Sequence, residues 1–493
     1  MIAANLPALQ VVVPLIAAPV CALLRRGGLA WLLTFAVTWV AFAIALALLA
    51  RVLADGPISY ELGGWAAPWG IEYRLDKLSA FVLLIVAGIG AAVLPCAYHS
   101  VRDEIPEDRH RLFYAAFLLA QTGLFGVVIT GDTFNLYVFL EIASLASYIL
   151  VGLGSHRRAL AAAYQYLVLG TIGATFILLG VGLLYMMTGT LNMADLASRL
   201  DGLEDLRPVR AALAFLTVGI ALKLALFPLH FWLPNAYTYA PSVVSAFLAG
   251  TSTKVGAYVL LRFLFTIFGE PFSFATMPVG EVLMPLALVA VFVGSLVAIF
   301  QNNVKRMLAY STVAQIGYIA LGISFASETG LIGGIVHVFN DALMKGALFL
   351  AMACVALKVG AVDLDAMRGL GRRMPLTMAA FVTAGLSLVG VPLTVGFVSK
   401  WYLVLAALER GLWPVAVLVL AASVLALVYV WRVVEVAYFR AAPEEAETGS
   451  EAPAALVVPT VALAALCLVF GIDTDLTVGV ARQAALTLLA GVP

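Results

Sequence analysis

Apolar segments of roughly twenty residues follow one another along almost the whole chain, separated by short polar connections. Residues 31–50, for example, contain no charged side chain. Of all 493 residues, 63% are hydrophobic and 11% are charged, whereas a soluble globular protein carries about 25% charged residues. So few charges do not cover the water-exposed surface of a chain this long. We therefore predict that the apolar segments cross a lipid bilayer.

About fourteen such spans can be placed, since a helix needs about 20 apolar residues to cross the hydrocarbon. The first six are expected at about Leu6–Leu24, Leu29–Leu53, Leu78–Tyr98, Leu112–Thr130, Phe134–Leu153 and Ala159–Met187. The others are expected at Val209–Phe227 with a continuation to Tyr239, at Ser242–Phe268, and from near Val282, Val304, Gly330, Leu376, Leu412 and Ala454. The tail after Phe470 is expected to form a short amphipathic segment. These spans predict an all-α polytopic membrane protein with a single membrane domain.

Lysine and arginine residues fall unevenly on the two sides of these spans. With the N-terminus outside, about fifteen basic residues lie on the inner side and roughly eight on the outer side, which is the bias of a correctly oriented bundle. An even number of spans then places both termini on the outer face. The acidic run Glu444–Glu451 lies in an inner loop in this orientation.

Several classes of function are excluded by charge and motif content. The 28 basic and 28 acidic residues give no net charge, so no basic excess exists to bind nucleic acid. The four cysteines occur singly, without a CxxC pair, and the five histidines are too dispersed for a metal or haem centre. No GxxxxGK[ST], HExxH or GxSxG motif occurs. We therefore expect no cofactor and no metal.

Ionisable residues inside the predicted spans are the most informative feature. A charge at the bilayer centre costs at least about 2.5–3.5 kcal/mol, so it persists mainly where it faces protein or trapped water. Such residues occur in five spans: Glu141, Lys223, Lys254, the trio His337, Asp341 and Lys345, and Lys400. The trio is spaced i, i+4, i+8 and therefore lies on one face of a helix, where Asp341 can pair with either neighbour.

These residue types suit proton transfer. A buried lysine holds its proton when a carboxylate is close and releases it more easily when the carboxylate moves away. A row of such groups, bridged by histidine and water, can pass protons along. Any one of them could instead be a static ion pair that fixes the position of a helix. Five charged spans together favour a pathway.

Two of the charged spans contain helix-breaking residues. The span of Lys223 is interrupted at Pro228, and that of Lys400 at Pro392. Broken helices in two halves of a membrane protein indicate repeats with an ion pathway between them. His230, at the first break, either takes part in the relay or satisfies a freed backbone carbonyl. Arg262, near the end of its span, is expected to extend toward the interface.

Four segments carry a family resemblance: Thr130–Gly154, Gly219–Arg262, Asn303–Gly322 and His337–Leu350. With these motifs the chain resembles the antiporter-like subunits of respiratory complex I, membrane-bound hydrogenases and Mrp-type multisubunit cation/proton antiporters. The FNLYVFLEI segment, residues 134–142, and the TGTLNMADLA segment, residues 188–197, look most like the D subunit of the Mrp antiporters.

The resemblance implies a domain organisation with two inverted five-helix repeats, each containing a broken helix. Its parts are N-terminal helices in residues 1–110, a first repeat in 111–269, a second repeat in 281–440, and a C-terminal helix and tail in 454–493.

The resemblance also implies site roles. Glu141 modulates Lys223, and protons then pass through Lys254 and the eleventh helix, with His337 and Lys345, to Lys400. Two positions depart from the family pattern. Residue 341 is aspartate where HxxNHAxxK has histidine, and the second break, GVPLTVGFVSK, lacks a double proline.

Three functions follow as hypotheses. The first is a proton-translocating subunit of a multisubunit antiporter for Na⁺ or another monovalent cation, which is not itself an enzyme. It would lie in the inner membrane of a bacterium with other membrane subunits as partners. The second is a proton-pumping membrane subunit of complex I or a membrane-bound hydrogenase. The third is a membrane scaffold, although a scaffold needs none of the central charges.

Overall fold

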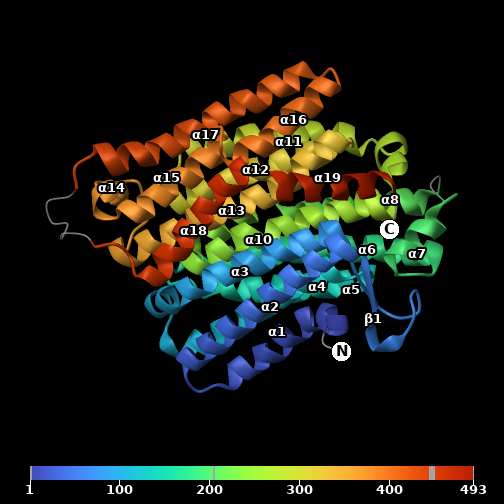
Figure 1. Ribbon diagram of the computed structural model, residues 1–493, viewed down its shortest axis with the longest axis horizontal. Helices are drawn as coiled ribbons and strands as arrows, with labels where there is room; N and C mark the ends of the chain where they lie inside the picture. Colours follow the sequence, from blue (N-terminus) through green and yellow to red (C-terminus); the bar gives the residue numbers. More distant parts are fainter. Residues whose placement is uncertain (1–2, 204–205, 443–449, 492–493) are drawn as a thin grey trace.

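Long apolar helices lying roughly side by side make up most of the protein (Figure 1). The computed structural model describes residues 3–203, 206–442 and 450–491. Within these residues, twelve helices are long and apolar enough to cross a membrane. Two further spans are each divided in two: α8 (Arg207–Leu224) with α9 (Trp232–Tyr239), and α15 (Pro375–Val389) with α16 (Val395–Glu409). The described chain therefore contains the number of spans that the sequence predicts.

The undivided spans of the first part are α1 Leu6–Leu23, α2 Gly27–Asp55, α3 Lys77–Glu104, α4 His110–Ile129, α5 Thr133–Gly152, α6 Arg158–Thr188 and α10 Ser242–Leu261. Those of the second part are α11 Val279–Ile299, α12 Val304–Ser324, α13 Glu328–Val359, α17 Trp413–Phe439 and α18 Ala454–Ile472. Shorter helices are α7 Met193–Leu200, α14 Leu370–Arg373 and α19 Asp475–Leu489. The helix α19 occupies the place of the predicted amphipathic tail.

Both divided spans are interrupted where the backbone leaves the helical region. After α8, Ala225 adopts a left-handed conformation with φ of 59°, and Pro228 follows before α9 begins. After α15, Gly390 has φ of 92°, and Pro392 follows before α16 begins. Proline lacks the N–H that a helix needs, and glycine tolerates positive φ at little cost. The interrupted span is the fourth of five in both α4–α10 and α11–α17, as inverted repeats require. The boundaries of the repeats stay a prediction.

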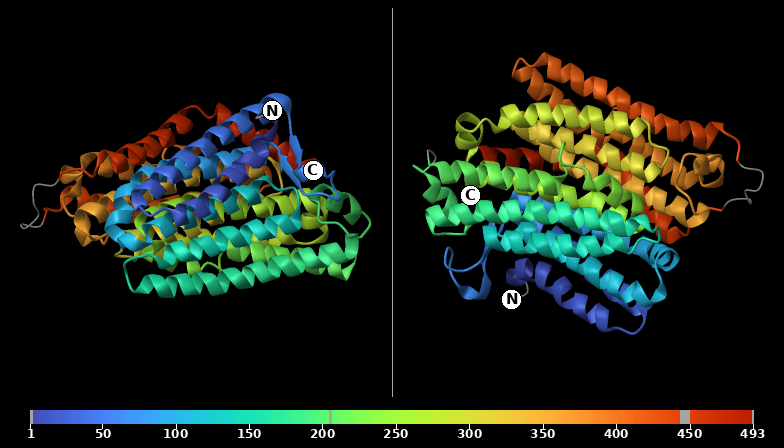
Figure 2. Two further views of the ribbon diagram at one scale, coloured as in Figure 1. Left: turned by 90° about the horizontal axis from the view of Figure 1, so that it is seen from below. Right: turned by 180° about the vertical axis from the view of Figure 1, so that it is seen from behind.

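The chain crosses the bundle from one side to the other. The N-terminal helices α1 and α2 lie at one edge, α17 lies at the opposite edge, and α10 and α13 lie between them (Figure 1). Both termini are found at the same end of the bundle in all views (Figures 1 and 2). The side of the membrane on which they lie stays a prediction.

The predicted all-α fold is confirmed, with one small addition. Strands β1 (Ile58–Glu61) and β2 (Glu72–Leu75) pair antiparallel between α2 and α3. Strands of four residues carry too little hydrophobic periodicity to be recognised in the sequence. Of the acidic run Glu444–Glu451, residues 444–449 lie outside the described residues.

Candidate functional site

Glu141 and Lys223 meet at the first broken helix. The Lys223 Nζ atom lies 3.2 Å from Oε1 of Glu141 and donates a hydrogen bond of 2.8 Å to the Ser144 hydroxyl. Glu141 and Ser144 share one face of α5 because they are three residues apart. The Lys223 side chain is 8% exposed, whereas that of Glu141 is 22% exposed. The carboxylate therefore has more freedom to move than the ammonium group.

Lys254 of α10 and Asp341 of α13 form an ion pair at the centre of the bundle. Both side chains are 0% exposed. The Lys254 ammonium also donates to the Ala249 carbonyl at 2.6 Å. The second carboxylate oxygen of Asp341 has no hydrogen-bond partner among the described residues. Although the spacing allows Asp341 to pair with a neighbour on its own helix, its counter-charge in the structure is Lys254 of the facing helix.

The other two members of the α13 trio both contact α12, and His337 also contacts α16. Lys345 donates to the Leu308 carbonyl at 3.1 Å and to the Ser311 hydroxyl, both on α12. Nδ1 of His337 lies 2.8 Å from the Ser399 hydroxyl, and Nε2 lies 3.1 Å from Oε1 of Gln315. Since an amide oxygen only accepts, Nε2 carries a proton in this arrangement and Nδ1 of a neutral ring accepts from Ser399.

Lys400 lies just after the second broken helix. Its ammonium donates to the carbonyls of Leu388 and Val389 at 3.0 and 2.9 Å and to the Ser423 hydroxyl at 3.1 Å. Both carbonyls belong to the last turn of α15, where helix carbonyls have no partner within the helix and carry partial negative charge. The ammonium also lies 4.8 Å from the ring centre of Tyr318. Tyr318 in turn contacts the His337 ring edge-on at 5.5 Å, so it connects the two predicted residues.

Two predicted connections are not direct. No hydrogen bond joins Lys223 to Lys254 in the part of the chain that the structure describes. His230 lies in the break between α8 and α9, with its ring stacked against Phe227 and Phe231 at 5.3 and 4.9 Å. Its Nδ1 has no hydrogen-bond partner among the described residues. The structure thus brings His230 near the first break without linking it to a charged group.

The polar face of α12 was not predicted from the sequence. Ser311, Gln315 and Tyr318 are buried and contact Lys345, His337 and Lys400 respectively. Their signal in the sequence is the i, i+4, i+7 spacing, which places all three on one face of an otherwise apolar helix.

A further buried ion pair joins Arg262 to Asp76. The expectation that Arg262 extends to the interface is wrong, since its side chain is 9% exposed and donates to Oδ1 of Asp76 at 2.5 Å. Asp76 also caps the N-terminus of α3 by accepting from Ser79 N–H at 2.9 Å. Burial alone raises the pKa of the Asp76 carboxyl, but the Arg262 guanidinium and the Ser79 hydrogen bonds hold this pKa below its usual range.

We expect Asp76→Ala to destabilise the protein by about 2–4 kcal/mol, because it removes a helix cap and leaves a buried guanidinium unpaired. Thermal denaturation of the purified complex measures this. Asp55→Ala is the matched control: the Arg51–Asp55 pair is 40% and 73% exposed and contributes little. A lowered folded-state pKa contributes stability above about pH 4 that is lost as pH falls through the folded value. The difference in thermal stability between the Asp76→Ala and Asp55→Ala variants should therefore persist through neutral pH and shrink in acid. Equal stability of the two variants at pH 7 would contradict a role for the Arg262–Asp76 pair.

Membrane-spanning helices that are broken at two places and carry a row of buried charges define a polytopic membrane protein with a polar interior. Residues 130–426 match the family described as NADH:quinone oxidoreductase/Mrp antiporter, transmembrane. The chain belongs to this family, and the membership predicted from its charged motifs is confirmed.

A relative named as an oxidoreductase subunit and a relative named as an antiporter subunit both match nearly the whole chain. The NADH-quinone oxidoreductase N subunit of Desulforudis audaxviator is 43% identical over 489 residues, which cover 96% of each chain. The Na(+)/H(+) antiporter D subunit of Bacillus subtilis is 32% identical over 491 residues, covering 98% of this chain and 97% of the relative.

Two solved structures share the fold over the full length. A chain of the Mrp complex from Dietzia sp. DQ12-45-1b has a TM-score of 0.91 and 27% identity, and the match covers 100% of this chain and 98% of that one. A chain of the membrane-bound sulfane sulfur reductase, an archaeal respiratory membrane complex, has a TM-score of 0.89 and 32% identity, covering 99% and 98%.

Proposed function

We propose that this chain is the proton-translocating subunit of a multisubunit antiporter that exchanges protons for a monovalent cation, with Na⁺ the first candidate. Its partners are other membrane subunits, and its location is the inner membrane of a bacterium. The observation that carries the proposal is the fully buried Lys254–Asp341 pair between α10 and α13. An ion pair is costly to bury at this depth, which favours a functional role for it, and charged groups on three further helices accompany it. The relative named as an antiporter in Bacillus subtilis favours an antiporter here.

In this proposal Glu141 controls the proton on Lys223. The lysine holds its proton while the carboxylate lies 3.2 Å away and releases it when the carboxylate withdraws. The proton then reaches the Lys254–Asp341 pair. Because Lys223 and Lys254 share no hydrogen bond in the described chain, this step requires bridging water.

From α13 the proposed path continues to Lys400. His337 contacts Ser399, the residue before Lys400, and Tyr318 lies between the His337 ring and the Lys400 ammonium. Three oxygens along this stretch have no hydrogen-bond partner among the described residues: Asp341 Oδ1, Tyr318 Oη and Tyr429 Oη. Buried polar groups without protein partners usually bind ordered water, which supplies the bridging donors and acceptors that proton transfer needs.

The second candidate function is a proton-pumping subunit of a redox complex, either complex I or a membrane-bound hydrogenase. The 43% identical relative from Desulforudis audaxviator, named as an oxidoreductase subunit, favours it. The same charged row would then be driven by electron transfer in other subunits.

Flux measurements on vesicles containing the purified complex separate the two candidates. An antiporter collapses an imposed pH gradient when Na⁺ is added without any electron donor, and K⁺ and choline chloride serve as controls for cation selectivity. A redox pump moves protons only when donor and acceptor are supplied. A response that depends on electron donors would therefore replace the antiporter proposal with the second candidate.

We expect Glu141→Ala to lower exchange severely and Glu141→Asp to retain part of it. Aspartate keeps the carboxylate but is one methylene shorter, so the 3.2 Å contact with Lys223 lengthens. Alanine removes the group that sets when Lys223 releases its proton. The initial rate of cation-induced pH change, normalised to complex content, is the measurement. An unchanged rate in Glu141→Ala would remove the modulation step from the proposal.

A further inference from the structure

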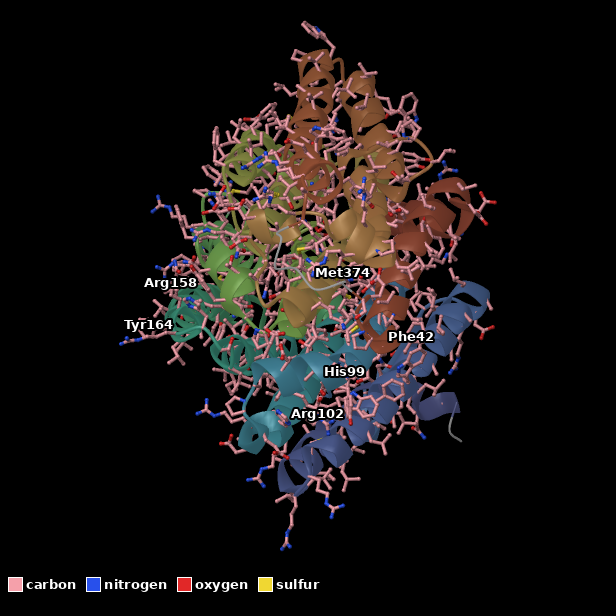
Figure 3. The ribbon with its side chains drawn as sticks, turned by 90° about the vertical axis from the view of Figure 1, so that its left-hand side faces the viewer. Phe42, His99, Arg102, Arg158, Tyr164 and Met374 are labelled. Carbon is pink, nitrogen blue, oxygen red and sulfur yellow. The ribbon has the colours of Figure 1, made fainter. Side chains whose placement is uncertain are left out.

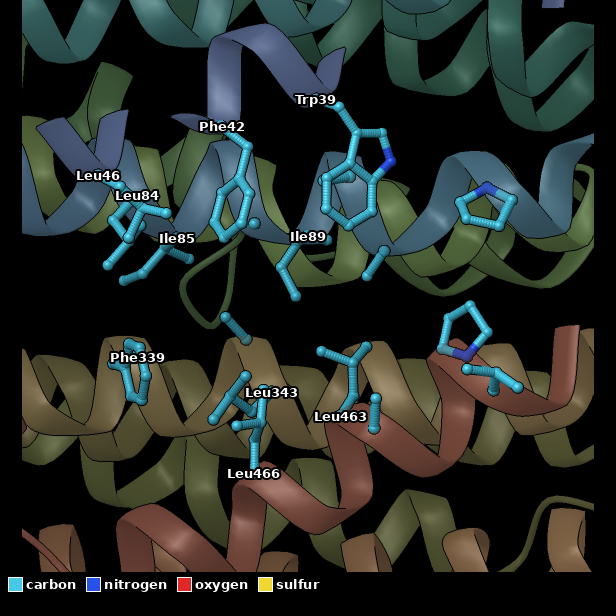
Figure 4. A pocket seen from close by; sticks show the side chains of 18 of the residues that line it. Trp39, Phe42, Leu46, Leu84, Ile85, Ile89, Phe339, Leu343, Leu463 and Leu466 are labelled. Carbon is cyan, nitrogen blue, oxygen red and sulfur yellow. The ribbon is translucent and has the colours of Figure 1, made fainter. Parts of the chain in front are cut away.

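An apolar cavity of about 620 Å³ lies between α2, α3, α13 and α18 (Figure 4). Every residue that lines it is apolar, among them Phe42 of α2, Ile89 of α3, Leu343 of α13 and Leu463 of α18. Trp39, on its rim, is 44% exposed, so the cavity is continuous with the surface that faces the bilayer. The cavity is not part of the proposed proton path. Whatever part of a molecule enters it must be apolar.

The floor of this cavity is the back of the charged helix α13. Phe339, Ala342 and Leu343 line the cavity, whereas His337, Asp341 and Lys345 face the bundle interior. At 3.6 residues per turn, the two sets point about 150° apart. Anything that fills the cavity therefore packs against the helix that carries the central charges.

The lining of the cavity favours a hydrocarbon chain as its occupant. Its walls consist of apolar side chains, and a space of about 620 Å³ has room for an acyl chain. A flexible acyl chain needs no polar partners and adapts to the shape of the walls. The aromatic rings of Trp39 and Phe42, whose centroids lie 5.9 Å apart along α2, belong to one wall.

A positively charged residue, Arg102, lies beyond the end of the cavity on the same face of α3. Pro95 lines the cavity, His99 follows after four residues, and Arg102 after seven, about 10 Å further along the helix. The Arg102 guanidinium stacks over the Tyr98 ring at 4.2 Å. In the view of Figure 3, His99 lies between Phe42 and Arg102. A phosphate at Arg102 and an acyl chain in the cavity suit one molecule.

We infer that this cavity binds an acyl chain of an anionic phospholipid, whose phosphate lies at Arg102 and whose chain supports α13 from behind. The inference does not depend on the proposed transport function.

Photo-crosslinking of the intact complex tests the site. The complex is reconstituted with phosphatidylglycerol that carries a diazirine in the middle of one acyl chain, and labelled residues are mapped by mass spectrometry. We expect labels on the cavity residues of α2, α3 and α18 in excess over the exposed residues of α6. The zwitterionic analogue, phosphatidylcholine, should label the cavity less. Arg102→Gln should reduce the preference for phosphatidylglycerol about fivefold.

A matched pair of glycine substitutions tests the cavity itself. Gly88 lines it, and a Cβ built there lies 3.4 Å from Phe42, so Gly88→Leu fills the space and should reduce labelling severalfold. Gly182 of α6 has nothing within 4 Å of a built Cβ, so Gly182→Leu should leave labelling unchanged. Equal labelling of the cavity and of α6 would overturn the inference in favour of ordinary boundary lipid. Absence of label from the cavity of the intact complex would also overturn it, since another subunit then covers the site. Arg102→Gln keeps the test decisive if Gly88→Leu does not assemble.

Discussion

Replacing Lys223 by alanine is expected to abolish cation/proton exchange, to the level of vesicles without the complex, while leaving the amount of assembled complex unchanged. The substitution removes the only ammonium group that contacts Glu141 in the described structure. The carboxylate left behind is 22% exposed in this chain and can be neutralised by protonation, so the loss of its partner does not oblige the site to hold an unpaired charge. Exchange is measured in vesicles from the pH change that follows a cation pulse, and assembly by native gel electrophoresis.

Lys223→Arg separates proton transfer from a static ion pair. Arginine keeps the positive charge and can still contact Glu141 and Ser144, but a guanidinium does not release its proton in proteins. A proton-transfer role therefore predicts that Lys223→Arg assembles and does not exchange. Lys358→Arg is the matched control, because Lys358 lies at an exposed helix end and donates to Ser450 at 3.1 Å. Normal exchange by Lys223→Arg would show that the charge alone matters, as the scaffold hypothesis holds.

The fold could be predicted in large part because lipid imposes simple rules on sequence. Apolar length marks each span, and both interrupted spans contain a proline at the break, although Pro95, Pro285 and Pro459 lie inside unbroken helices. What remained hidden is the local backbone: the first break begins at Ala225, which has a positive φ although alanine favours a helix. Packing around the break imposes that conformation, and no pattern in a single sequence reveals it.

The site could be predicted as a set of residues but not as a set of contacts. The spacing of His337, Asp341 and Lys345 places them on one face of α13, yet their partners lie on three neighbouring helices, α10, α12 and α16. Periodicity within a helix gives the direction of a side chain and says nothing of the partner that faces it. The same limit explains Arg262, whose position near a helix end suggested exposure although Asp76 meets it inside the protein.

Lys254→Met and Asp341→Leu are each expected to lower assembly severely, by an amount equivalent to about 3–5 kcal/mol, because each leaves a charge without its partner in a site that is 0% exposed. This contrasts with Lys223, whose partner Glu141 is 22% exposed in this chain and is not fully enclosed by protein. The double substitution removes both charges together, so it should restore assembly and thermal stability toward the original values, less the cost of fitting leucine, which is larger than aspartate, into a packed site. Exchange should nevertheless stay at background, since the row of titratable groups is interrupted.

The comparison of these three variants separates stability from transport in a way that no single substitution does. Native gels and thermal denaturation give the coupling energy of the pair, and the vesicle assay gives its contribution to exchange. If the two destabilisations simply add in the double variant, the residues do not act as a pair. If the double variant assembles and exchanges at the original rate, the pair only holds α10 against α13. Restored assembly with lost exchange is the result that a proton-carrying pair requires, because a static ion pair can be replaced by apolar packing and a proton carrier cannot.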